Sequence, residues 1–263
     1  MIPKLRLPRF SLHAASKVWL RNYTIYRKTY MANILPNFFE PLIYLLGMGI
    51  GLGAFVRQIE GLPYLTFIAP GLMASSAMMG ASFETTYNCF VKLHFGKTYD
   101  AMLVTPLDAE DIMLGEVMWA TTRSLIYGLS FFVIISIFGI PVWTSLFTVV
   151  PVVALIGALF AVFGLLFTSL ITVIDLYSYY FTLFMTPMFL FSGIFFPLDT
   201  LPSWVEKVAW FTPLYHAVKI SRAGVLGTWG GDEFIDIAWM VVITVILMIS
   251  ASILLRRRMI VGE

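Results

Sequence analysis

Residues 146–174 read LFTVVPVVALIGALFAVFGLLFTSLITVI, a run of 29 residues without a charged side chain. A helix needs about 20 mostly apolar residues to cross a bilayer, so this run can span a membrane and must tilt or project beyond it. The whole chain shares this character, because 59% of its 263 residues are hydrophobic and only 12% are charged. A soluble domain carries about twice that share of charge. The sequence therefore predicts an all-α polytopic membrane protein.

Further apolar runs flank this segment on both sides. Together they predict six transmembrane helices, over residues 37–56, 63–83, 117–138, 146–174, 176–196 and 235–255. Only Asp175 and its neighbours separate the fourth span from the fifth, so that turn must be very tight. The chain then divides into a cytoplasmic arm at residues 1–36, a transmembrane domain at 37–255 and a cytoplasmic tail at 256–263.

Lysine and arginine are distributed unevenly beside these spans. Cytoplasmic flanks of membrane helices carry an excess of both residues. With the N-terminus inside, the cytoplasmic segments hold thirteen of them and the outer segments hold four, namely Arg57, Lys207, Lys219 and Arg222. Both termini are therefore predicted to be cytoplasmic. Seven of the thirteen lie in the first 36 residues, so we expect no signal peptide there.

Two segments outside the spans have the composition of interfacial helices. Residues 11–35 mix aromatic with basic side chains, which predicts an amphipathic helix lying in the membrane interface. Residues 197–233 are too long for a turn and too apolar for a free loop. We expect two short interfacial or re-entrant helices there, the first over residues 204–211 with Ser203 as its N-cap.

Residues 95–98 read FGKT and come close to an ATP-binding P-loop. The P-loop pattern also requires a glycine five residues before Gly96, where this chain has Val91, and it follows a β-strand rather than a membrane helix. We therefore expect no ATP site in this chain. Residues 97–107 (KTYDAMLVTPL) instead predict a short amphipathic helix that a Thr-Pro pair ends. This helix is either a docking helix for an ATPase or a solvated connector.

Alternate glycines mark the first predicted span. Gly47, Gly49, Gly51 and Gly53 form two overlapping GxxxG patterns, which allow another helix to approach closely. They form no dinucleotide-binding motif, because no strand precedes them. The approaching helix can belong to the same subunit or to a second one, and glycine spacing leaves both open.

Few charged residues fall near membrane depth. Glu40, Glu84, Arg123 and Asp175 each lie near a predicted span end, and the span interiors are otherwise uncharged. An ion-coupled carrier normally needs an acidic residue or a broken helix at the midplane, so this pattern argues against that class. We expect Glu40 to pair with a basic residue of the arm. Asp175 either forms the tight turn or contacts an ATPase.

Residues that support catalysis or metal binding are sparse. The single cysteine, Cys89, excludes a disulfide framework and a cysteine-based metal site. His13, His94 and His216 lie far apart in sequence, and His216 is expected on the surface. We therefore expect a non-catalytic chain with no cofactor, no metal and no nucleic-acid partner.

Several stretches resemble the permeases of ABC-2 type transporters. Residues 191–227, FSGIFFPLDTLPSWVEKVAWFTPLYHAVKISRAGVLG, are similar to the C-terminal motif of that family. EPLIYLLGMGIGLGAFV, YLTFIAPGLMASSAM and FGKTYDAMLVTPLDAEDIMLGEVMWA are similar to its NodJ-type branch. That branch is linked to lipo-oligosaccharide export and neighbours the daunorubicin-type drug permeases. The resemblance runs from about Trp19 to the last span, and its six-helix plan agrees with the span count.

The resemblance implies partners and sites. It implies a homodimer in the lipid of the bacterial inner membrane, with two copies of a separate cytoplasmic ATPase that bind ATP and Mg. The arm and the loop between the second and third spans would touch this ATPase, which implies coupling residues Trp19, Tyr23, Tyr26, Lys97, Thr98, Tyr99, Asp100, Leu103, Thr105, Pro106 and Asp175. The first and fifth spans would line the substrate path and its lateral gate, which implies Phe38, Phe39, Tyr44, Tyr177, Tyr179, Tyr180, Phe184 and Met188. The same path residues can equally be helix-packing core.

Together these features predict the permease subunit of an ATP-driven exporter. An aromatic and methionine-rich wall suits an amphipathic or lipid-linked substrate that needs packing rather than a charge-specific site. ATP binding to the partner would drive alternating access through the docking helix. Three alternatives stay open: a drug or small-hydrophobe efflux permease of the same fold, an ion-coupled secondary carrier, and a structural membrane-anchoring subunit.

Overall fold

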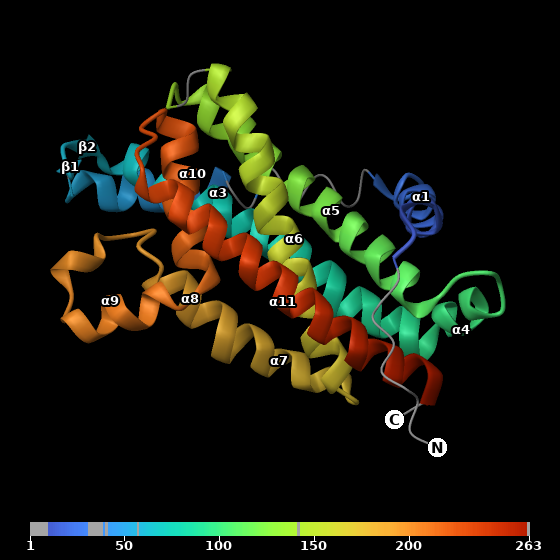
Figure 1. Cartoon of the computed structure of the whole chain (residues 1–263). Coiled ribbons are helices and arrows are strands. Elements are labelled where there is room, and N and C mark those ends of the chain that lie inside the picture. Colours follow the sequence, from blue (N-terminus) through green and yellow to red (C-terminus); the bar gives the residue numbers. More distant parts are fainter. Residues whose placement is uncertain (1–9, 31–38, 40–41, 57, 141–142, 262–263) are drawn as a thin grey trace.

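The computed structural model describes residues 10–30, 39, 42–56, 58–140 and 143–261. Of the sequence predictions, those on Phe38 and Glu40 lie outside the described residues. Within them the chain is almost entirely helical (Figure 1). This agrees with the all-α prediction.

The arm contains the helix that its sequence predicts. Helix α1 runs from Leu12 to Tyr26, and the Ser11 hydroxyl caps it by accepting from the Ala14 amide at 3.3 Å. Its buried side chains, Ala15 and Val18, pack against helix α5. The arm is therefore attached to the helical bundle.

The first predicted span is a short helix with irregular turns. An apolar helix over Leu42–Ala54 includes a π-helical segment, η1 (Leu45–Gly51), and a 3₁₀ turn, η2 (Leu52–Ala54). A short β-hairpin follows. Its strands have two residues each, and β1 (Gln58–Ile59) pairs antiparallel with β2 (Leu62–Pro63).

The second helix is longer than its apolar pattern predicts. Helix α3 (Tyr64–Phe83) continues through two π-helical segments, η3 (Glu84–Asn88) and η4 (Val91–Phe95), and so extends over 32 residues. The sequence placed a cytoplasmic loop from Glu84 onward, and this was wrong. Glu84 stays in the helix because its carboxylate finds partners inside the bundle.

The third helix also begins before its apolar run. The short helix α4 (Thr98–Leu103) leads into α5 (Ala109–Ile137), whose N-terminus carries a capping box formed by Asp108 and Asp111. The helix begins eight residues before the predicted span start at 117, because the acidic residues before it are paired. The Asp111 carboxylate accepts from the Ser11 amide at 2.8 Å, and Glu110 pairs with Arg256 at 2.8 Å.

The fourth and fifth predicted spans are both shorter than expected. After a 3₁₀ turn, η5 (Trp143–Ser145), helix α6 runs over Leu146–Leu170 and ends four residues before its predicted limit of 174. The tight turn contains η6 (Ile174–Leu176). The fifth helix then follows as α7 (Tyr177–Tyr179), η7 (Tyr180–Met185) and α8 (Thr186–Phe191).

The outer segment folds into two helices as predicted. A 3₁₀ turn, η8 (Leu198–Thr200), precedes α9 (Ser203–Trp210) and α10 (Pro213–Leu226). The predicted N-cap was wrong by one residue, since Pro202 holds that position and Ser203 begins the helix. Arg222 of α10 donates from Nη2 to the carbonyls of Gly193 and Phe67, and so fixes the turn after the fifth helix against α3.

The last helix includes most of the residues that were predicted to form the cytoplasmic tail. Helix α11 runs from Asp232 to Val261, so residues 256–261 are helical rather than a free tail. Arg256 pairs with Glu110, and Arg258 donates to the Thr168 carbonyl and to His94. These contacts hold the end of α11 against three other helices.

Helix α6 lies at the centre of the bundle, packed against α3, α5 and α11. Among the described residues, four helices are long and apolar enough to cross a membrane: Tyr64–Phe95, Ala109–Ile137, Leu146–Leu170 and Asp232–Met259. Figure 1 shows α1, α4 and the end of α11 gathered at one end of the bundle, with β1, β2 and α9 at the other. We call these the arm end and the hairpin end.

Candidate functional site

The predicted coupling residues on and around helix α4 fall into a buried set and an exposed set. Tyr99 is 1% exposed and, with Met102, anchors the helix to the bundle. Thr98 and Leu103 are half-buried. The exposed predicted residues are Lys97, Asp100, Thr105 and Pro106, with Asp175 exposed on η6. A partner at the arm end would therefore meet one face of α4.

The predicted coupling residues of the arm make contacts with other side chains of the same chain. Trp19 donates from its indole Nε1 to the Thr122 hydroxyl at 2.9 Å and stacks on Tyr23. Tyr26 packs edge-on against Trp119 of α5. These rings join α1 to α5.

A cleft separates the arm from α4. It has a volume of about 330 Å³ and is lined by Lys17, Val18 and Arg21 of α1 and by residues 96–107 around α4. Its arm wall is basic. The cleft shares Thr105 with the exposed set of predicted coupling residues, so the two lie on one surface of the arm end.

A buried charge cluster lies directly behind this surface, formed by Glu84, Lys92, Glu116 and Arg123. Lys92 Nζ lies 2.7 Å from Glu116 Oε2 and 3.2 Å from Glu84 Oε1, and Arg123 Nε lies 3.6 Å from Glu84 Oε2. Asn22 of α1 donates to Glu116 at 3.1 Å. The charge cluster therefore links the arm, the π-helical part of α3, and α5.

This cluster was not predicted from the sequence, because Glu84 and Arg123 were each expected near a separate span end. The spacing of these residues along the sequence does indicate the cluster. Glu84, Asn88 and Lys92 stand at i, i+4 and i+8, which places them on one helical face if the helix continues. Glu116 and Arg123 are seven residues apart and share a face in the same way.

A groove near the first helix carries several hydroxyl groups. It has a volume of about 340 Å³ and lies between the Leu42–Ala54 helix, α3, α5 and α8. Tyr44, a predicted path residue, lines it together with Ser75, Ser76, Tyr127 and Thr186. We call it the hydroxyl groove. It combines aromatic surface with hydrogen-bonding groups and has no charged residue in its lining.

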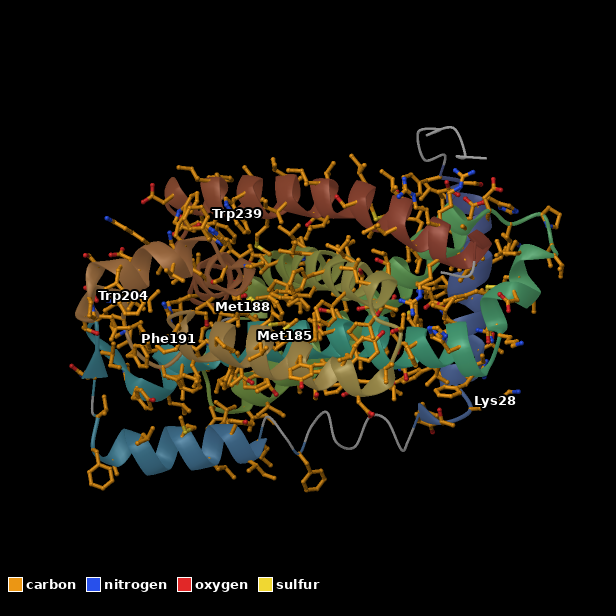
Figure 2. All side chains as sticks on the ribbon, turned by 90° about the horizontal axis from the view of Figure 1, so that it is seen from below. Lys28, Met185, Met188, Phe191, Trp204 and Trp239 are labelled. Carbon is orange, nitrogen blue, oxygen red and sulfur yellow. The ribbon has the colours of Figure 1, made fainter. Side chains whose placement is uncertain are left out.

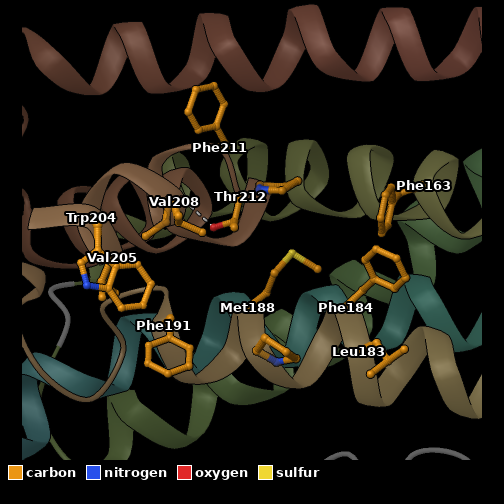
Figure 3. A pocket seen from close by; sticks show the side chains of 13 residues that line it. Phe163, Leu183, Phe184, Met188, Phe191, Trp204, Val205, Val208, Phe211 and Thr212 are labelled. Atoms are coloured by element: carbon orange, nitrogen blue, oxygen red, sulfur yellow. Dashed lines mark hydrogen bonds between the residues drawn. The ribbon is translucent and has the colours of Figure 1, made fainter. Parts of the chain in front are cut away.

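A second cavity opens at the hairpin end, between the fifth helix and α9 (Figure 3). This outer pocket has a volume of about 410 Å³, and its lining contains no charged side chain. Two predicted path residues, Phe184 and Met188, line it; Phe184 lies beside Phe163 of α6, and Trp204 and Val208 of α9 contribute to the lining as well. In Figure 2 Met188 and Trp204 lie far from Lys28 of the arm end, along a bundle whose middle is mostly carbon.

The remaining predicted path residues do not share these cavities. Tyr177 and Tyr180 are fully buried, and their hydroxyls donate to Thr168 at 2.8 Å and to Ser82 at 3.3 Å. In a single chain they are packing residues. Phe39 and Tyr179 are each 56% exposed and face outward.

The glycines of the first helix face two directions. A Cβ added at Gly49 would collide with Leu65 of α3, and one at Gly53 would approach Tyr64 at 3.9 Å. Among the described residues, a Cβ at Gly47 or Gly51 would meet nothing within 4 Å. One GxxxG pair therefore packs inside the chain and the other lies on an open face.

His216 is buried rather than on the surface as expected, with 1% exposure. Its Nδ1 lies 2.6 Å from the Asp236 carboxylate and its Nε2 lies 2.7 Å from the Trp210 carbonyl. The sequence missed this because Asp236 lies 20 residues away, at the start of α11. Lys219 Nζ also lies 3.0 Å from Asp236. Burial acts to lower the pKa of Lys219, but hydrogen bonding and charge attraction from Asp236 outweigh it and raise that pKa.

Features of a catalytic or nucleotide site do not appear in the part of the chain that the structure describes. No three of its His, Cys, Asp and Glu side chains form a group that could hold a metal ion. The near P-loop at residues 95–98 begins at the end of a helix, and Lys97 adopts a left-handed backbone before α4.

Comparison with known proteins places the chain in a family. The ABC-2 type transporter profile matches residues 15–226. The chain belongs to the ABC-2 type transporter family. As a member it is a multi-pass membrane protein and a permease subunit of an ABC transporter.

Curated relatives narrow the similarity within the ABC-2 family. The chain is 37% identical over 242 residues to a "Nodulation protein J" of Rhizobium leguminosarum bv. viciae, covering 92% of this chain and 93% of that protein. It is 39% identical to a protein of the same name from Rhizobium leguminosarum bv. trifolii, covering 92% of each. The "Inner membrane transport permease YadH" of Escherichia coli (strain K12) is 24% identical, over 81% of this chain and 83% of that one.

Proposed function

We propose that this ABC-2 permease exports an amphipathic or lipid-linked molecule, similar to a lipo-oligosaccharide, out of the cytoplasm or the inner leaflet. The hydroxyl groove supports this substrate class most directly. Sugars are bound by hydroxyl groups and aromatic faces, and an acyl chain needs apolar surface. Tyr44, Ser75 and Ser76 offer both in one uncharged groove.

The orientation we propose has six spans, with both termini in the cytoplasm of a bacterial inner membrane. The Leu42–Ala54 helix and the fifth helix serve as the first and fifth spans, together with the four longer helices. The arm end then faces the cytoplasm and the hairpin end faces outward. The excess of lysine and arginine at the arm end supports this orientation.

A separate ABC ATPase supplies the energy in this proposal, and it binds the ATP and Mg. The chain acts as a homodimer with two ATPase copies, and the exposed face of α4 receives the motion. A matched pair of variants tests this coupling. Asp100→Ala, on α4, should reduce transport per ATP hydrolysed in proteoliposomes that contain both subunits. Asp199→Ala, exposed at the hairpin end, should leave that ratio unchanged. Equal ratios in both variants would place the coupling elsewhere.

A second pair of variants tests the substrate path. Tyr44→Ala should lower glycolipid transport, because it removes the aromatic wall of the hydroxyl groove. Ile43→Ala is the control, since the neighbouring Ile43 is 65% exposed and does not line the groove. If both variants transport the glycolipid at the wild-type rate, the groove is not the path.

The alternative cargo is a drug or small hydrophobe. The outer pocket favours it, because its lining is almost wholly apolar. A Met188→Trp variant would fill this pocket. Loss of small-hydrophobe efflux with normal glycolipid transport would support the alternative.

A further inference from the structure

A cavity of about 300 Å³ lies at the arm end, distinct from the hydroxyl groove and the outer pocket. It lies between α1, the π-helical part of α3 and α5, and we call it the arm cavity. Its lining includes the cations Arg21, Lys92 and Arg123, together with Asn88 and Glu84. Volumes of about 300 Å³ upward are typical of sites for small ligands and headgroups.

Arg123 is the central cation of the arm cavity. It is 8% exposed, and its guanidinium lies 4.6 Å from the centre of the Tyr26 ring and 5.3 Å from that of Tyr127. Its Nη1 has no hydrogen-bond partner among the described residues. A buried donor without a partner is costly, and for a charged group the cost is higher still. Arg123 Nη1 can therefore donate a hydrogen bond to an acceptor from outside the chain.

The neighbouring carboxylates are already engaged. Glu84 faces Lys92 through Oε1, while its Oε2 accepts from Asn88 at 2.9 Å. Glu116 accepts from Lys92 and Asn22 through Oε2, and it does not line the cavity. Three cations thus face two carboxylates. The balance is positive. Arg123 Nε and Nη1, which line the cavity and have no hydrogen-bond partner in the described part of the chain, are donors, whereas the unpaired acceptor Glu116 Oε1 belongs to a residue outside the lining.

The position of the cavity specifies the kind of anion. The arm helix beside it exposes Tyr23 and Ile25, which are 41% and 50% accessible, and carries Arg27 and Lys28 just after its end. Such a helix lies at the level of lipid headgroups. In the proposed orientation that leaflet is the cytoplasmic one, which is rich in anionic lipid, and basic pockets between helices on this side bind phosphate headgroups.

We propose that the arm cavity binds the phosphate group of an anionic phospholipid from the inner leaflet. Arg123 Nη1 and Arg21 donate to the phosphate oxygens, and the guanidinium fork suits a phosphate better than an ammonium does. The lipid joins α1 to α3 and α5 and stiffens the arm end. This site rests on the proposed orientation and is independent of the exported substrate.

Two arginines of the arm form the matched pair for the test. Arg21 lines the cavity, whereas Arg27 is exposed just beyond α1 and does not line it. The purified chain is placed in nanodiscs with phosphatidylglycerol, and retained lipid is counted by native mass spectrometry. Arg21→Gln should weaken phosphatidylglycerol retention at least about tenfold, as expected for a lost charge-assisted hydrogen bond. Arg27→Gln should weaken it at most about fivefold, the effect of a surface charge on an anionic membrane.

Two further measurements separate the sources of phosphate and the role of geometry. Inorganic phosphate should not displace the lipid, and displacement by it would overturn the lipid assignment in favour of a free anion. Arg123→Lys keeps the charge and should still weaken retention, because it lacks the fork. Equal losses in Arg21→Gln and Arg27→Gln would mean non-specific attraction only and would overturn the proposal. Thermal unfolding without phosphatidylglycerol checks that each variant is folded.

Discussion

The two ends of the bundle are stabilised by different means. At the arm end, four buried charged side chains bridge α3 and α5, and α1 is hydrogen-bonded to one of them. At the hairpin end there is an uncharged pocket, and Asp236 pairs with the buried His216 and the partly exposed Lys219. Buried ion pairs depend on fixed geometry, whereas apolar contacts tolerate sliding and repacking. The arm end is therefore expected to be the stiffer of the two, and the hairpin end the more adaptable.

The largest expected effect is at the arm end. Glu116→Ala leaves Lys92 buried without its nearer carboxylate, at 2.7 Å, and removes the acceptor of Asn22. Breaking a buried pair in this way costs roughly 3–5 kcal/mol of stability. Unfolding by SDS in mixed micelles measures the loss. The exposed Asp100→Ala at the same end should change stability by less than about 0.5 kcal/mol. A loss in Glu116→Ala no larger than that of the control would mean that the charge cluster does not stabilise the fold.

A smaller loss is expected at the hairpin end. His216→Phe retains the ring that stacks on Trp239, with centroids 4.1 Å apart, but removes both polar contacts. Asp236 keeps Lys219 as a partner. We therefore expect a loss of about 1.5–3 kcal/mol, the value of hydrogen bonds to a charged group. The same SDS titration measures it, with the exposed Glu206→Gln as control. If His216→Phe lost more stability than Glu116→Ala, the hairpin end and not the arm end would depend more on its buried polar contacts.

The third prediction concerns how tightly the arm is attached. A Cβ at Gly115 of α5 would lie 2.5 Å from Val18 Cβ and 2.7 Å from the Ala15 carbonyl oxygen. Because a backbone atom blocks the space, Gly115→Ala must push α1 away, at a cost of about 1–3 kcal/mol. Hydrogen exchange of the α1 amides should then accelerate. Gly231→Ala meets nothing within 4 Å and should leave this exchange unchanged. Normal exchange in both variants would show that the arm is not held by this contact.

The sequence predicted the apolar middle of the molecule better than its ends. The apolar run predicted the helix at Leu146–Leu170, because burial in an apolar environment leaves a compositional trace. The apolar pattern did not predict that Glu84 and Glu116 lie within helices. A charged residue can stay inside a helix of the bundle when it has an oppositely charged partner, and these partners lie far along the chain. The prediction that His216 lies on the surface was wrong for the same reason. The site was predicted only in part: Tyr44, Phe184 and Met188 line cavities, whereas the burial of Tyr177 and Tyr180 depends on tertiary packing that composition does not record.

The smallest expected effect within one chain is on the open face of the first helix. A Cβ at Gly47 meets nothing within 4 Å, so Gly47→Ala should change the stability of a single chain by no more than about 0.5 kcal/mol. The same change should weaken a homodimer that packs this face, because small residues allow helices to approach closely in a membrane. Dimer fraction in nanodiscs and single-chain unfolding separate the two effects. Gly49→Ala is the opposite control, since its Cβ meets Leu65 of the same chain and should affect folding first. A Gly47→Ala chain with an unchanged dimer fraction would remove this face from the interface and leave both GxxxG pairs without a role between subunits.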